Sequence, residues 1–131
     1  MPAKFIIVHH SACTAGSFHY LITAKAQVQQ LLKDDQPGIH KDSLGVVIEG
    51  DFTDQQPTQQ QIEALRELIV ELSMRYPNIQ LGGHRQVRSN QTDCPGAQFP
   101  LSELREWVTT KLETQRHKRQ QTLIESQYLT F

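Results

Sequence analysis

The chain has 131 residues, of which 37% are hydrophobic and 21% are charged, and its formal net charge is -1 at pH 7. This length suits one domain with a single core, and the composition is ordinary for a soluble globular protein. A charge so close to zero gives no long-range attraction to nucleic acid or to an anionic membrane, so we expect neither as a partner.

The apolar run Phe5–Val8 is too short for a membrane span or for the core of a signal peptide. We therefore expect no export signal in the chain as given. Cytoplasmic localisation, release by lysis and export by another route all stay open.

The first half of the chain predicts four strands. Lys4–His9 is β-branched and apolar with no breaker, which is typical of a buried strand. Phe18–Thr23 and Gln27–Leu32 follow, and we expect them to pair as a hairpin across Ala24–Ala26, although this turn has no Asn-Gly or Asp-Gly signal. Leu44–Glu49 is a near-continuous apolar run and predicts a central strand.

A helix is predicted to begin after Thr58. Thr58 is a good N-cap, and Gln61 is placed to complete a capping box with it. Apolar residues then recur at steps of three and four, which indicates one buried helix face: Ile62, Leu65, Ile69, Leu72 and Tyr76. Pro77 and Asn78 are expected to end this helix.

The remaining elements are a short strand, a second helix and a tail. Ile79–Leu81 predicts the strand, and Pro100 is expected to open the helix, with one apolar face formed by Leu101, Leu104, Val108 and Leu112. We expect a domain over residues 1–112 and an extension over residues 113–131, either a longer polar helix or a tail that contacts a partner. The order of elements predicts a mixed α/β fold, with a central mixed β-sheet flanked by helices.

Three residues have the chemistry of metal ligands. His9 and His84 each follow an apolar run that predicts a strand, and Cys94 comes ten residues after His84 among turn-forming residues. Two imidazoles and one thiolate with a fourth position free are typical of catalytic zinc, because structural zinc normally has four protein ligands. His10 alternates to the opposite face of its strand, so we expect His9 to face the metal. His10 is then a satisfied polar residue or a group that supports the ligands.

A disulfide is the alternative use of the cysteines. The chain has two, Cys13 and Cys94, and a bond between them would indicate a structural domain without metal. If Cys94 binds metal, Cys13 is an unpaired thiol near the first ligand strand.

Four segments occur in a characteristic order: Val8-His9-His10-Ser11-Ala12, Ser43-Leu44-Gly45-Val46, Gly83-His84-Arg85-Gln86-Val87 and Thr92-Asp93-Cys94-Pro95-Gly96. In them the chain resembles the type 2 N-acetylmuramoyl-L-alanine amidases, a family that includes bacteriophage amidase-type lysozymes and animal peptidoglycan recognition proteins. The resemblance runs from about Lys4 to Trp107. It implies the fold of that family, Zn²⁺ held by His9, His84 and Cys94, and hydrolysis of the amide bond between N-acetylmuramic acid and L-alanine in peptidoglycan or muropeptides.

The resemblance also implies roles near the metal. Thr92 matches a family threonine that hydrogen-bonds the oxyanion, and His40 resembles a family histidine that lines the cleft. Where the family has a catalytic tyrosine this chain has Phe18, and where cytoplasmic recycling amidases have a glutamate it has Val47.

Two nearby groups are candidates to replace the missing ones. Tyr20 and Glu49 each lie two residues further along the same predicted strand, and hence on the same face as the missing group. A bulge that turns His19 inward is a further alternative. The alternatives to a catalytic role are that Tyr20 is a half-buried packing residue and that Glu49 is an acid at a strand end in solvent.

A second departure from the family lies between Ser11 and Ser17. Family members usually place there a helix that forms a wall of the peptide groove, and this chain has only a few small residues. We expect a minimal version of the fold, without that first helix and with a groove open on that side. The absent tyrosine and glutamate keep a second function open, a non-catalytic module that binds peptidoglycan or muropeptides.

Overall fold

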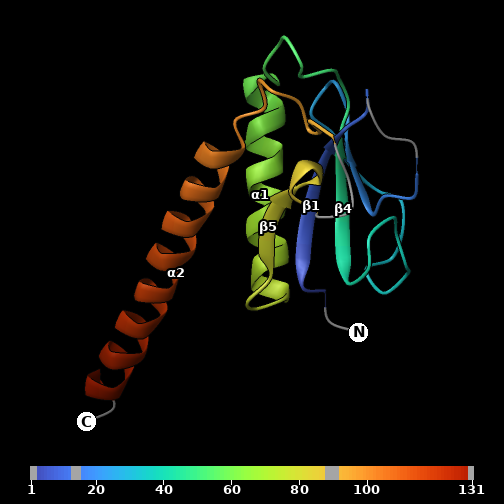
Figure 1. Ribbon diagram of the computed structural model, residues 1–131. Coiled ribbons are helices and arrows are strands. Elements are labelled where there is room, and N and C mark those ends of the chain that lie inside the picture. Colours follow the sequence, from blue (N-terminus) through green and yellow to red (C-terminus); the bar gives the residue numbers. More distant parts are fainter. Residues whose placement is uncertain (1–2, 13–15, 88–91, 130–131) are drawn as a thin grey trace.

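A computed structural model describes residues 3–12, 16–87 and 92–129 of the chain (Figure 1). Five strands form one sheet in the order β3-β2-β4-β1-β5. The strands are β1 (Phe5–His10), β2 (Tyr20–Ile22), β3 (Val28–Gln30), β4 (Ser43–Ile48) and β5 (Gln80–Gly83). The helices are α1 (Gln59–Arg75), the short 3-10 helix η1 (His84–Gln86) and α2 (Leu101–Leu129).

The sheet is mixed, as the sequence predicts. Strand β1 runs parallel to both β4 and β5, β2 runs parallel to β4, and β3 pairs with β2 in the antiparallel hairpin. The hairpin turn has Ala26 in the left-handed region at φ 63°, so this turn forms without the Asn-Gly signal. In the register, His9 pairs with Val47, and Val8 pairs with Gly83, the last residue of β5. The predicted ligands His9 and His84 therefore lie at neighbouring strand ends.

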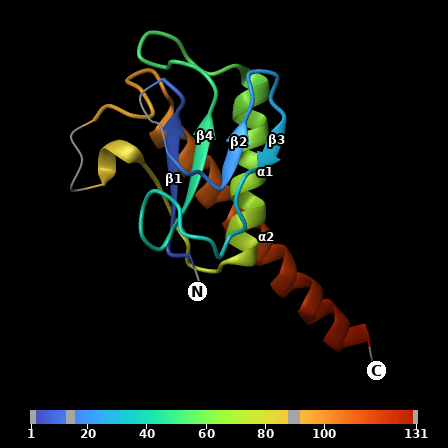
Figure 2. The same ribbon diagram turned by 90° about the vertical axis from the view of Figure 1, so that its right-hand side faces the viewer.

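Both long helices lie on the same side of the sheet (Figures 1 and 2). Helix α1 begins with the predicted capping box, in which Thr58 Oγ1 accepts the Gln61 N–H and Gln61 Oε1 accepts the Thr58 N–H, both at 3.1 Å. The buried Gln61 amide also donates to the carbonyl oxygens of Thr23 and Glu49, at 3.1 and 3.0 Å. This one side chain therefore caps the helix and fastens it to the chain after β2 and β4.

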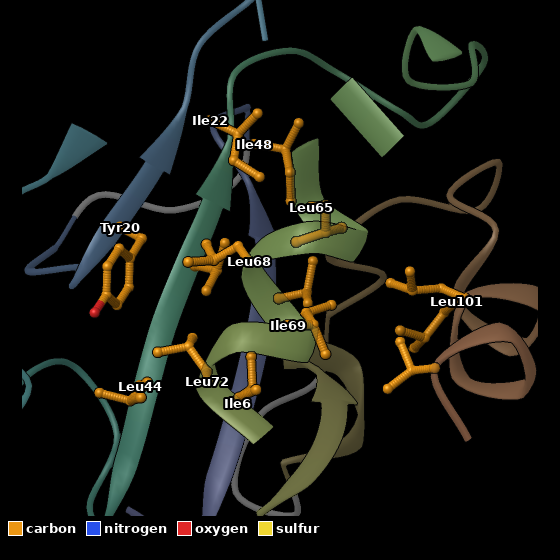
Figure 3. Close-up of a cluster of buried hydrophobic side chains, with 14 of the residues drawn as sticks. Ile6, Tyr20, Ile22, Leu44, Ile48, Leu65, Leu68, Ile69, Leu72 and Leu101 are labelled. Carbon is orange, nitrogen blue, oxygen red and sulfur yellow. The ribbon is translucent and has the colours of Figure 1, made fainter. Parts of the chain in front are cut away.

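The hydrophobic core lies between the sheet and these helices, as Figure 3 shows. Alternation along β1 sends Ile6 and Val8 into this core, while Ile7 and His9 point to the opposite face. The core is completed by apolar residues of all layers, among them Ile22, Leu44, Ile48, Leu65, Ile69, Leu72, Leu101 and Leu104. Between the two helices the Arg66 guanidinium lies 4.8 Å from the ring centre of Trp107. The face of the sheet that carries His9 has no long helix over it among the described residues.

The C-terminal helix is longer than its apolar face. Leu101, Leu104 and Val108 are buried and Leu112 packs against the core, whereas residues 113–122 are largely exposed. The helix nevertheless continues to Leu129, and its far half extends away from the sheet (Figure 1). The division of the chain at residue 112 stays a prediction. Of the described helices, none has the length and apolarity needed to cross a lipid bilayer.

The connection from β1 to β2 is short, as predicted. Its described residues, 11–12 and 16–19, are not helical.

Candidate functional site

Three histidine side chains come together on the sheet face opposite α1. His9, His40 and His84 each offer a ring nitrogen, and these three atoms lie within 4.8 Å of one another. The ring centres are 4.7 Å apart for His9 and His84, 5.0 Å for His40 and His84, and 5.4 Å for His9 and His40, whose planes are stacked at 6°. Three nitrogen donors at such spacing can hold a divalent metal ion.

His9 faces the site because of strand alternation. Its neighbours Val8 and His10 point to the other side of β1, where His10 Nδ1 accepts the Phe52 N–H at 3.0 Å. His10 is therefore a buried, satisfied polar residue, as the sequence indicates. Its backbone still serves the site, since the His10 N–H donates to Cys94 Sγ at 3.4 Å.

His84 begins η1 directly after the glycine pair that ends β5. A Cβ on Gly83 would lie 2.9 Å from Leu101 Cδ2 and 2.9 Å from Pro95 Cδ. Only glycine lets β5, the start of α2 and the segment after Cys94 approach so closely. This close approach brings the Cys94 segment back beside the strand ends.

Cys94 is buried and lies against His9. Its Sγ is 3.9 Å from His9 Nδ1, and the Cys94 side chain is 1% exposed. The three ligand atoms that lie within 4.8 Å of one another belong to His9, His40 and His84. The prediction had Cys94, and not His40, as the third ligand. The structure thus puts the predicted ligands His9, His84 and Cys94 in one neighbourhood and adds His40 to them. Cys13 lies outside the described residues. The alternative of a disulfide between Cys13 and Cys94 therefore stays a prediction.

The electrostatic surroundings favour neutral imidazoles. Burial first, and then the neighbouring His84, His40 and His10, together lower the pKa of His9 to about 3. Burial, followed by His84, also lowers the pKa of His40. Neutral imidazole is the form that binds metal. His9 Nε2 and His40 Nε2 are buried and have no hydrogen-bond partner among the described residues, so a cation between them would satisfy lone pairs that otherwise cost energy.

Thr92 is held close to the predicted thiolate ligand. Its Oγ1 accepts the Cys94 N–H at 3.2 Å, and its side chain is half-buried. A hydroxyl has two lone pairs and one proton. The Thr92 O–H therefore remains able to donate to another oxygen.

Phe18 and Val47, which stand in place of the family's tyrosine and glutamate, lie beside the histidines. Their side chains have no proton that they could donate. The Phe18 ring centre is 4.9 Å from that of His9, and Val47 is the β4 partner of His9. Both side chains are buried and apolar. Of the groups that can carry a proton, the structure brings His40 to within 4.8 Å of the predicted ligands His9 and His84.

The expected placement of Tyr20 beside the metal is wrong. Its ring lies in the core between the sheet and α1 (Figure 3), and its hydroxyl donates to Asp34. Burial and the bond to Asp34 raise the pKa of Tyr20 to about 12, so it stays protonated at neutral pH. The physical reason is that Phe18 precedes β2, whose first residue is Tyr20, so strand alternation does not connect these two positions.

Glu49 and His19 are also engaged elsewhere. Glu49 follows β4, and its Oε1 accepts the Ala24 N–H at 2.7 Å, which fastens the hairpin turn. The buried His19 ring accepts the Gly45 N–H at Nδ1 (3.0 Å) and lies 2.7 Å from the Gln36 carbonyl oxygen at Nε2. The structure therefore brings neither residue to the histidines.

Comparison with known proteins agrees with this geometry. Residues 1–97 match the family described as N-acetylmuramoyl-L-alanine amidase. A curated peptidoglycan recognition protein of Trichoplusia ni is 34% identical over 73 residues, which make up 53% of this chain and 38% of that protein. The matched part of the chain thus spans well under half of that relative.

Solved structures show the same fold. N-acetylmuramoyl-L-alanine amidase LysC from Clostridium intestinale URNW superposes with a TM-score of 0.75 at 22% identity, over 83% of this chain and 87% of that one. PGRP-SA of Apis mellifera superposes with a TM-score of 0.70 at 16% identity, over 82% and 84%. The family match covers most of the sequence, and the fold agrees with it. The chain belongs to the N-acetylmuramoyl-L-alanine amidase family.

Proposed function

We propose that this protein is a zinc-dependent amidase that cleaves the amide bond between N-acetylmuramic acid and L-alanine in peptidoglycan or muropeptides. The observation that carries the proposal is the gathering of His9, His40 and His84, with the Cys94 thiol beside them, in a member of the amidase family. Nitrogen and sulfur donors of this kind suit zinc better than magnesium or calcium.

His9, His84 and Cys94 would hold the zinc ion. The neutral state of His9 and the buried position of Cys94 support this assignment. Bound zinc supplies a Lewis acid that polarises the amide carbonyl and activates water. His40, which the structure adds to this neighbourhood, is then left for the substrate.

His40 and Thr92 would act on the substrate directly. A neutral His40 imidazole has one N–H and one lone pair, so it can donate to the carbonyl oxygen or pass a proton to the leaving amine. Thr92 accepts the Cys94 N–H and keeps its own O–H for the oxygen on which negative charge develops.

Two matched variants separate binding of the metal from chemistry. Cys94→Ala is expected to lose both tightly bound zinc and release of stem peptide from a muropeptide. His40→Gln is expected to keep about one zinc per chain and to lose about 10²-fold or more in turnover, a typical cost of a missing acid-base group. Zinc content by mass spectrometry and product release by chromatography are measured on the same samples.

The outcomes distinguish the assignments. Normal turnover by Cys94→Ala would end the proposal in this form, whereas zinc loss by His40→Gln together with zinc retention by Cys94→Ala would make the three histidines the ligands. Cys13→Ala is the control and is expected to resemble the unaltered protein. If it behaves like Cys94→Ala, a bond between the two cysteines is indicated.

A second function has one specific observation in its favour. Phe18 and Val47 occupy the positions next to His9 at which relatives have proton-carrying groups, and this suits a module that binds muropeptide without cutting it. The zinc-loaded protein would then bind a muropeptide saturably and release no product over long incubation. Product formation above the Cys94→Ala background excludes this function.

A further inference from the structure

The His10 side chain points away from the candidate metal site and is buried, with 3% of its surface exposed. Its Nδ1 accepts the Phe52 N–H at 3.0 Å, and the centres of the two rings are 5.9 Å apart. His10 directly follows His9 at the end of β1, whereas Phe52 belongs to the loop between β4 and α1. The hydrogen bond therefore fastens this loop to the strand that carries the first predicted ligand.

Phe52 is in turn bonded to the segment that follows Cys94 (Figure 1). Its carbonyl oxygen accepts the Gln98 N–H at 2.9 Å, and its ring lies in the core with its centre 6.0 Å from that of Phe99. Gly96 has a φ of 111°, and a Cβ on it would lie 2.5 Å from the carbonyl carbon and oxygen of Phe52. Such a close approach requires glycine. The Phe52 backbone thus joins the end of β1 to the Cys94 segment.

The backbone of His10 also contacts Cys94 directly. The pairing of β1 with β5 ends at Val8 and Gly83, and beyond this point the His10 N–H donates to Cys94 Sγ at 3.4 Å. Groups that orient a metal ligand through a hydrogen bond commonly change metal affinity by about 10- to 100-fold. His10 contacts the sulfur through its backbone and reaches the segment behind it through its side chain.

We infer that His10 is a positioning residue for the metal centre: its imidazole holds the Phe52 backbone, and through it the Cys94 segment, so that Cys94 Sγ lies beside the strand of His9. The inference rests on the proposed function in that it takes Cys94 as a metal ligand. An apolar side chain could fill the space of the imidazole, but the Phe52 N–H would lose this acceptor. The loop and the Cys94 segment would then move away from β1 together.

Two variants separate the hydrogen bond from the volume of the side chain. His10→Leu removes the acceptor and keeps most of the volume, whereas His10→Asn is smaller but has an acceptor oxygen on Cγ, where histidine has Nδ1. His10→Leu is expected to weaken zinc binding about 10- to 100-fold, and His10→Asn to stay within about threefold of the unaltered protein, because it keeps the bond to Phe52. Competition with a chromophoric chelator measures these affinities.

Gln61→Leu is the control for a general loss of stability. Gln61 is as buried as His10, and its amide donates to the carbonyl oxygens of Thr23 and Glu49, outside the Cys94 segment. This variant is expected to lower the melting temperature and to keep the zinc affinity. Equal zinc affinities of His10→Leu and His10→Asn, or an equal loss in Gln61→Leu and His10→Leu, would overturn the inference.

Cobalt in place of zinc reports on the sulfur itself. A thiolate bound to Co²⁺ gives a charge-transfer band in the near ultraviolet, and the unaltered protein, His10→Asn and Gln61→Leu are expected to show the same band. In His10→Leu the band is expected to be weaker and shifted, and an unchanged band would contradict the inference. If His10→Leu does not fold, His10→Gln replaces it in every measurement, since its acceptor lies one carbon further from the backbone.

The metal-free protein keeps this inference separate from the proposed function. In a Cys13→Ala background Cys94 is the one remaining cysteine, and a disulfide reagent reaches its buried thiol when the segment opens. His10→Leu is expected to react about tenfold faster than His10→Asn, and equal rates would count against the role given to His10. If the unaltered protein binds no zinc, the proposed function fails, while this comparison still decides whether His10 holds the Cys94 segment.

Discussion

The backbone N–H of Arg85 donates to the carbonyl oxygen of Cys94 at 2.8 Å. The Arg85 guanidinium adds a second bond, from Nη1 to the Gly96 carbonyl oxygen at 3.2 Å. Arg85 directly follows His84, so these two bonds join the predicted second and third ligands into one unit. His9, on a strand in the interior of the sheet, and His40, on a loop, approach this unit from separate parts of the chain.

Gly83→Ala is expected to separate this unit from β1. The new methyl group would meet Leu101 and Pro95 at 2.9 Å, so we expect a loss of about 1–3 kcal/mol in the free energy of unfolding. We also expect weaker zinc binding, because the Cys94 segment has to shift. Gly82→Ala is the control, since its methyl group would meet the end of the Gln86 side chain at 3.0 Å and Ile7 Cδ1 at an ordinary contact distance of 4.0 Å. Equal urea denaturation curves for the two variants would contradict the role given to Gly83.

Removal of the metal is expected to lower the melting temperature. A ligand present at 1,000 times its Kd stabilises the folded state by about 4 kcal/mol. Calorimetry of the zinc-loaded protein with and without a chelator measures this difference. The Cys94→Ala protein should melt at one temperature in both conditions, and a chelator effect that survives this change would show that the metal does not depend on Cys94.

Asp34→Asn is expected to reduce stability at neutral pH and to have less effect in acid. Burial alone would raise the pKa of the Asp34 carboxyl, but hydrogen bonds from Tyr20, Tyr76 and Arg75 hold it below the usual 3.8. A carboxyl whose pKa is lower in the folded state contributes stability above the unfolded-state pKa and loses it as the pH falls through the folded-state pKa.

The measurement for Asp34 is urea denaturation from neutral pH to well below 3.8, the ordinary pKa. At neutral pH we expect a loss of about 2 kcal/mol, the scale of a hydrogen bond to a charged group. Asp35→Asn, an exposed neighbour, serves as the control. A difference between Asp34→Asn and the unaltered protein that stays constant across this range would contradict the linkage.

His19→Ala is expected to loosen the loop that carries His40. The imidazole joins the Gly45 N–H of β4 to the Gln36 carbonyl of that loop and is 1% exposed. Its removal leaves a cavity and two backbone groups without partners, so a loss of about 2–4 kcal/mol is expected. His117→Ala, at an exposed position of α2, should leave the melting temperature unchanged. Proteolysis near Gln36 would increase in His19→Ala alone.

Patterns local to one element predicted most of the fold. The apolar runs of β1 and β4 and the capping box of α1 are confirmed close to their predicted bounds. The apolar face predicted for α1 is also confirmed, because its spacing of three and four residues follows from helix geometry alone. The length of α2 was not predictable in this way, since its exposed part beyond Leu112 has no apolar periodicity.

Features that depend on how segments meet were harder to predict. Tyr20 was expected at the metal because strand alternation was counted from Phe18, which lies before β2. His40 was expected to line the cleft, and its place within 4.8 Å of two other imidazole nitrogens depends on the path of the loop anchored by His19 and Asp34. No short pattern encodes such a path, because its anchors are far apart in the sequence.

The position of β1 in the sheet has a consequence for the dynamics of the site. Strand β1 is hydrogen-bonded to β4 on one side and β5 on the other, so its amide protons should exchange with deuterium only when the whole domain unfolds. The segment that presents His40 has few such bonds, and its amides should exchange through small local openings. One donor is thus fixed by the backbone of the sheet, while another depends on the side-chain anchors of a loop, so the two should differ in how readily their surroundings open.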